Sequence, residues 1–97
     1  MSGWGVETVE GGVLRRAGAE GAPALWFVHA LGDSSGAFLP LLSSRLSSAF
    51  ELLAPDLPGA GLSPIGTRPV DLEALAEWLA RAIRRFFEAL MAPHRPA

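Results

Sequence analysis

Short apolar runs and turn-forming residues alternate along this chain and predict strands and helices in a definite order. The pair Gly11-Gly12 separates VETVE at 6–10 from VLRRA at 13–17, which predicts a tight hairpin. A nearly continuous apolar run, ALWFVHA at 24–30, is typical of a strand that is buried on both faces. A second short apolar run, ELLAP at 51–55, predicts another strand.

Two segments carry apolar residues at helical spacing. Between the last two strands, apolar positions recur every three or four residues and predict a helix over 37–48, with Pro40 in its first turn. A second helix is predicted over 71–91, with Asp71 as its N-cap and Val70 packed against Leu75 as a hydrophobic staple. The order strand, helix, strand predicts a right-handed βαβ unit, so the expected fold class is α/β.

Composition excludes several classes of protein. The chain has 97 residues, enough for one domain over 1–97, and its 49% hydrophobic and 19% charged residues are typical of a globular protein. The eight cations are scattered arginines, which argues against nucleic-acid binding. With no cysteine, two distant histidines and no G-x-G-x-x-G or P-loop pattern, we expect no metal and no cofactor. Without a signal peptide or an apolar run of about 20 residues, we expect a cytoplasmic protein that does not bind membranes.

Two loops that follow the predicted parallel strands carry the candidate chemistry. The first runs through His29, Ala30, Leu31 and Gly32. The second contains the pattern D-x-P-G-x-G-x-S, whose fixed positions are Asp56, Pro58, Gly59, Gly61 and Ser63. A tight loop at the carboxyl end of a parallel strand is well placed to present a backbone N–H group to a ligand. We interpret Asp56 and Ser63 as structural residues that hydrogen-bond the backbone of their own loop.

Together the two motifs and their spacing resemble the N-terminal part of the α/β-hydrolase family, over roughly residues 6–97. In that family a His-Gly motif opens the oxyanion loop, and here Ala30 stands at the position of the glycine. The resemblance implies that the Leu31 N–H is the oxyanion donor. It also implies hydrolysis of an ester, thioester or related acyl bond by a Ser-His-acid triad.

The resemblance further implies that a large part of the family's fold lies outside this sequence. In the family the nucleophile follows a strand that comes after the helix predicted here over 71–91. We therefore expect a partial α/β-hydrolase sheet, truncated before the nucleophile strand and inactive alone. It would act on a small-molecule acyl substrate only when completed by the missing C-terminal half. Strand 24–30 would then have an open edge that pairs with a second copy or a partner chain. An alternative is a non-catalytic interaction module that uses this edge.

One more pattern raises the question of a nucleophile inside these residues. The segment GDSSG at 32–36 matches G-x-S-x-G, but that motif places its serine directly after a strand, whereas Ser34 lies five residues after His29. We interpret Ser34 or Ser35 as a helix cap. Two alternatives remain. In the first, Ser34 is a nucleophile in a G-D-S block that resembles the SGNH esterases, although their late Asp-x-x-His pair is missing. In the second, His29 acts as a general base toward Ser34.

Overall fold

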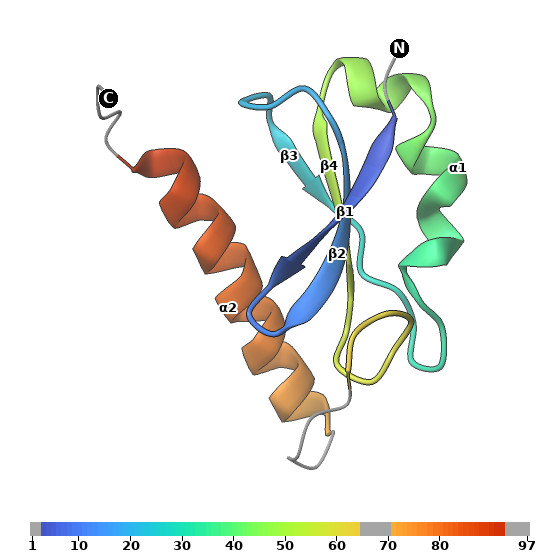
Figure 1. Ribbon diagram of the computed structural model, residues 1–97, viewed down its shortest axis with the longest axis vertical. Helices are drawn as coiled ribbons and strands as arrows, with labels where there is room; N and C mark the ends of the chain where they lie inside the picture. The colour runs from blue at the N-terminus through green and yellow to red at the C-terminus, as the bar shows by residue number, and fades with distance from the viewer. Residues whose placement is uncertain (1–2, 65–70, 93–97) are drawn as a thin grey trace.

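The computed structural model describes residues 3–64 and 71–92, which form a four-stranded sheet with helices on both sides (Figure 1). The strands, in the spatial order β1-β2-β4-β3, are β1 (Trp4–Val9), β2 (Gly12–Gly18), β4 (Glu51–Asp56) and β3 (Ala24–Trp26). β2 is antiparallel to both β1 and β4, whereas β3 and β4 are parallel. The predicted α/β class and the predicted parallel pair are therefore confirmed, and β3 is an edge strand of the described sheet.

The hairpin turn between β1 and β2 lies one residue earlier than predicted. Val9 pairs with Gly12, so the turn residues are Glu10 and Gly11, with φ of 48° and 75°. Two successive positive φ angles are typical of the type I′ turn that favours hairpins. Gly12 belongs to the strand instead, where a Cβ would lie 2.6 Å from Cζ2 of Trp78.

The strand predicted over 24–30 is shorter than expected and ends at Trp26. One further backbone hydrogen bond, from the Phe27 N–H to the Leu53 carbonyl at 2.9 Å, continues the pairing with β4. Beyond it the His29 side chain, rather than the backbone ladder, connects the chain to its neighbour: its Nε2 accepts the Leu57 N–H at 3.1 Å. This side-chain contact replaces the end of the predicted strand.

The prediction of a single helix over 37–48 is wrong, because the segment forms three short helical pieces. Pro40 does lie in the first turn of the middle one. The Ser44 hydroxyl donates to the Leu41 carbonyl at 2.6 Å and accepts the Leu46 N–H at 3.2 Å, so a side chain takes backbone partners that a continuous helix needs. The pieces are η1 (Ser35–Phe38), α1 (Leu39–Leu42) and η2 (Arg45–Ser48).

The long helix α2 (Leu72–Met91) matches its prediction within one residue. The Asp71 carboxylate caps it by accepting the Ala74 N–H at 2.7 Å. Leu75 is buried, whereas Val70, its predicted staple partner, lies outside the described residues. None of the helices in the described ranges has the length and apolar character needed to cross a membrane.

The two sides of the sheet have separate apolar clusters, because α1 and α2 lie on opposite sides (Figure 1). The cluster near α1 consists of Ala17, Leu42, Leu52 and Ala54, and the one near α2 of Leu57, Leu75, Trp78 and Ala82. The Trp78 indole N–H donates to the Glu10 carbonyl at 3.0 Å and joins α2 to the hairpin turn. Towards its C-terminal end α2 leaves apolar side chains exposed, including 56% of Phe87.

Candidate functional site

The two loops singled out in the sequence lie beside each other and enclose a cleft of about 340 Å³. The first loop contributes His29, Leu31, Gly32 and Asp33, and the second contributes Leu57 to Gly61; Leu75 of α2 completes the lining. The cleft thus forms at the carboxyl ends of the parallel strands β3 and β4, where ligands bind in open α/β sheets.

The buried imidazole of His29 joins the two loops. Its Nδ1 lies 2.8 Å from the Ala30 carbonyl oxygen, and its Nε2 lies 3.1 Å from the Leu57 nitrogen. Since the Leu57 N–H donates to Nε2, the ring proton lies on Nδ1 and is donated to Ala30. Both ring nitrogens are therefore engaged with backbone atoms, and neither faces Ser34.

The Leu31 N–H is available to a ligand. Within residues 3–64 and 71–92, no protein group accepts a hydrogen bond from it, and residue Leu31 is 69% exposed. The neighbouring Asp33 N–H donates to the Ala30 carbonyl at 3.0 Å, which closes a turn around Leu31 and Gly32. Gly32 has φ of 83°, a conformation that glycine adopts readily, so the turn holds a free donor at the cleft.

Asp56 is fully buried and fixes both loops. Its Oδ1 accepts the Ser35 N–H at 2.7 Å, and its Oδ2 accepts the Leu62 N–H at 2.9 Å. Burial opposes ionisation of this carboxyl group, but the hydrogen bonds from Leu62 and Ser35 and the positive charge of Arg15 outweigh it. The pKa of Asp56 consequently lies below its ordinary value of 3.8, and the group is a carboxylate at neutral pH.

Ser63 anchors the second loop to the hairpin. Its hydroxyl donates to the Asp56 carbonyl at 2.6 Å and accepts the Val13 N–H at 2.9 Å. The second loop also depends on glycine: Gly61 has φ of 51°, and a Cβ there would lie 2.5 Å from Oδ2 of Asp56. The motif residues therefore hold the loop in place, while the backbone lines the cleft.

One residue of this network, Arg15, was missed in the sequence. The Arg15 Nε donates to the buried Ser35 hydroxyl at 2.8 Å, which places a guanidinium next to the Asp56 carboxylate. Arg15 also stacks on the ring of Trp4, 4.8 Å from its centroid. Alternation along β2 places the Arg15 side chain on the same face of the sheet as Ala17. Nothing in the sequence indicates that it contacts Ser35.

Ser34 has the geometry of a helix cap. Its hydroxyl accepts the Gly36 N–H at 3.2 Å at the start of η1, and its N–H donates to Oδ1 of Asp33 at 2.8 Å. Its φ of −154° and ψ of 173° describe ordinary extended backbone rather than a strained elbow. Among the described residues no histidine contacts Ser34, and no group of three His, Cys, Asp or Glu residues is arranged to hold a metal ion.

Several solved structures share this fold. The chain is similar to a haloalkane dehalogenase from Bradyrhizobium elkani (TM-score 0.69, 23% identity, 92% of this chain and 31% of that one). It is also similar to the Cif epoxide hydrolase from Acinetobacter nosocomialis, with a TM-score of 0.63 and 25% identity over 87% of this chain and 26% of that one. A bacterial membrane phospholipase A gives a TM-score of 0.67 at 24% identity, over 97% of this chain and 29% of the other.

The chain spans less than a third of the length of these structures. No protein-family model matches the sequence, and no curated protein matches it significantly. The likeness in structure therefore establishes the fold and its partial extent, as the two loop motifs predicted.

Proposed function

We propose that this chain, which has the N-terminal portion of the α/β-hydrolase fold, supplies the oxyanion loop of an enzyme that hydrolyses an ester, thioester or related acyl bond. The observation that carries the proposal is the free N–H of Leu31, a residue that lines the cleft between the two loops. Attack on an acyl carbon places negative charge on the carbonyl oxygen, and a fixed backbone N–H stabilises that charge in the transition state.

The network under the cleft supports this role. The His29 ring holds the Ala30 carbonyl on one side and the Leu57 N–H on the other, so the turn that presents Leu31 cannot move independently of the second loop. The Asp56 carboxylate likewise fixes the end of the first loop, because it accepts the Ser35 N–H. A donor fixed before the substrate arrives needs little reorganisation during the reaction, which is how such donors accelerate acyl transfer.

In this proposal the nucleophile, its base and the acid lie outside the described residues. Ser34 caps η1, and the two nitrogens of His29 are occupied, so neither takes the role of a triad member. The 97-residue chain by itself is then inactive, because a hydrolase that loses its triad keeps only the weak catalysis of binding and the oxyanion hole.

A fluorophosphonate probe tests the absence of a nucleophile. The chain and its Ser34→Ala variant are both expected to remain unlabelled, with circular dichroism showing that both are folded. Labelling that disappears in the variant would instead make Ser34 a nucleophile and favour the SGNH-like alternative.

A chimera tests the oxyanion donor directly. Residues 24–64 replace the corresponding segment of the phospholipase that shares the fold. Leu31→Pro removes the N–H, whereas Leu31→Ala keeps it and serves as the matched control. We expect the proline variant to lose about 100-fold to 1000-fold in kcat and the alanine variant to lose little. Equal activities would overturn the assignment of Leu31.

A second candidate function rests on the edge of the sheet. β3 is an edge strand, and the nearby C-terminal half of α2 exposes Ile83, Phe87 and Leu90. Exposed strand edges pair with strands of other chains. A non-catalytic module that binds a partner, or a second copy, through β3 would use the same surface.

A further inference from the structure

A second cleft lies on the face of the sheet that bears α2, at the end of β4 opposite to the candidate site. Side chains alternate between the two faces of a strand, and directly paired residues share a face. Gly5 pairs with Arg16, and Gly18 pairs with Glu51, so these positions face the same way. The Arg16 guanidinium lies over the ring of Phe86, 5.3 Å from its centroid, which identifies this face as the one toward α2.

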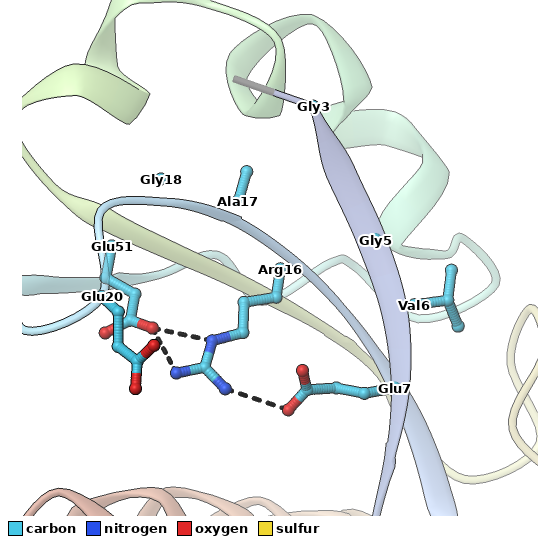
Figure 2. Close-up of a pocket in the computed structure, with 9 residues that line it drawn as sticks. All are labelled: Gly3, Gly5, Val6, Glu7, Arg16, Ala17, Gly18, Glu20 and Glu51. Carbon is cyan, nitrogen blue, oxygen red and sulfur yellow. Dashed lines mark hydrogen bonds and ion pairs between the residues drawn. The ribbon is translucent and has the colours of Figure 1, made fainter. Parts of the chain in front are cut away.

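The cleft has a volume of about 350 Å³ and is built around an ion-pair network. Figure 2 shows Arg16 between Glu51 and Glu7. The Arg16 Nε donates to Oε2 of Glu51 at 2.7 Å, Nη2 contacts the same oxygen, and Nη1 donates to Oε1 of Glu7 at 3.1 Å. Three of the other lining residues are glycines, at positions 3, 5 and 18.

The other carboxylate oxygen of Glu51 has no partner. Both guanidinium contacts fall on Oε2, and Oε1 is buried without a hydrogen bond in a side chain that is only 2% exposed. A buried anionic oxygen without a donor is costly, because it has lost its water and gained nothing in return. Glu20 presents a further carboxylate to the same side of the cleft (Figure 2).

The lining of the cleft carries more negative than positive charges, which favours a cationic ligand. Its lining contains the three carboxylates of Glu7, Glu20 and Glu51 and one guanidinium, that of Arg16. The described residues place no three ligands for a metal ion together, so a cation that carries its own N–H donors fits this lining better. A primary ammonium group is compact, is charged at neutral pH and has three such donors.

We propose that this cleft binds a primary ammonium group, which donates to Oε1 of Glu51 and to the carboxylate of Glu20. Since Oε1 is buried and Glu20 is exposed beside Glu51 in the lining of the cleft, binding in this proposal requires a shift of the Glu20 side chain. The sequence contains no lysine, so no side chain of this chain supplies the ammonium group. In this proposal it belongs to a free alkylamine or to a lysine side chain of another polypeptide.

Titration of the full 97-residue chain with n-butylamine at neutral pH, followed by the NMR shifts of backbone amides, tests the proposal. We expect saturable shifts at Gly5, Gly18 and Glu20, and no comparable shifts with n-butanol or with tetramethylammonium, which has no N–H donor. A short lysine-containing peptide is titrated in parallel. Saturation by the peptide alone assigns the site to a polypeptide lysine, and saturation by both assigns it to ammonium groups in general.

Two variants that leave the Arg16–Glu51 pair intact locate the site. Glu20→Gln removes one exposed charge and is expected to weaken binding about tenfold, the value of one charge-assisted hydrogen bond. Gly5→Val adds a side chain to the lining of the cleft where a Cβ meets nothing within 4 Å, so it occupies space in the cleft and is expected to abolish binding. Glu88→Gln on the exposed face of α2 is the matched control and should bind as the parent chain does. Absence of saturable shifts, equal shifts with tetramethylammonium, or unchanged affinity in both cleft variants would overturn the proposal.

Discussion

The carboxylate of Asp56 accepts the backbone N–H of Ser35 at 2.7 Å, which joins the end of β4 to a residue 21 positions earlier in the chain. The same carboxylate accepts the Leu62 N–H, so one buried charge holds both loops that line the candidate site. The loops are therefore part of the folded core of the domain rather than appendages to it, and changes at Asp56 should affect stability and site geometry together.

Replacing Asp56 by asparagine is expected to lower the free energy of unfolding by about 2–4 kcal/mol. The amide is the same size, but it brings an NH2 group against a backbone N–H and removes the charge that strengthens both hydrogen bonds. Urea unfolding followed by circular dichroism measures the loss. Asp33→Asn, which changes an exposed carboxylate beside the same loop, is the control and should cost less than about 1 kcal/mol.

The low pKa of Asp56 predicts a loss of stability in acid. Because its pKa is lower in the folded chain than its ordinary value of 3.8, the unfolded chain takes up the proton first as the pH falls. The stabilising contribution is complete above this ordinary value and disappears as the pH falls through the folded-state pKa. As the pH falls below about 4, the free energy of unfolding should decrease more steeply for the parent chain than for Asp56→Asn. Parallel curves would contradict this prediction.

Gly61 is expected to tolerate no side chain, for two separable reasons. Alanine there would adopt a positive φ and would also place its Cβ 2.5 Å from the Asp56 carboxylate. Gly21→Ala is the matched control, because Gly21 has φ of 89° with nothing within 4 Å of a Cβ. We expect Gly21→Ala to cost about 1–2 kcal/mol, the value of the backbone strain, and Gly61→Ala to cost clearly more. Thermal unfolding of both variants gives the comparison, and equal losses would show that the carboxylate moves aside freely.

His29→Ala should loosen the turn that presents Leu31. The substitution leaves the Leu57 N–H and the Ala30 carbonyl without their side-chain partner, at a cost of about 1–3 kcal/mol. Hydrogen exchange at the Leu57 amide is the sharper measurement, since its protection depends on Nε2 of the imidazole. Exchange at the Ser63 amide, which donates to the Ala60 carbonyl at 2.9 Å, should change less. If the Leu57 amide stays protected, the ring is not what fixes the two loops.

The edge of β3 is expected to promote self-association. A lysine on an edge strand hinders pairing with a further strand, so Val28→Lys, at a position that is 45% exposed next to β3, should shift sedimentation profiles toward the monomer. Val6→Lys, 48% exposed on β1 at the other edge of the sheet, tests whether the effect belongs to β3. A parent chain that sediments as a monomer at high concentration would argue against association through β3.

Local chemistry in the sequence determined the hairpin, the Asp71 cap and the long helix, because each depends on neighbours along the chain: a two-residue turn, a capping carboxylate, a stripe at helical spacing. Asp56 and Ser63 each hydrogen-bond a group of their own loop, Leu62 N–H and the Asp56 carbonyl, and these partners are also near them in the sequence. The helical spacing over 37–48 predicted one helix where three short pieces form. Apolar spacing carries no information on the competition of serine hydroxyls for backbone groups.

The tertiary structure alone decided the contacts between residues far apart in the chain. Ser35 meets Arg15 and Asp56, His29 meets Leu57, and the Glu51 carboxylate is buried with one oxygen unpaired, because the sheet order β1-β2-β4-β3 brings these segments together. Spacing along a sequence carries no information on which side chains share a buried volume across strands. That volume is set by the register of the sheet and by the helix that packs on each of its faces.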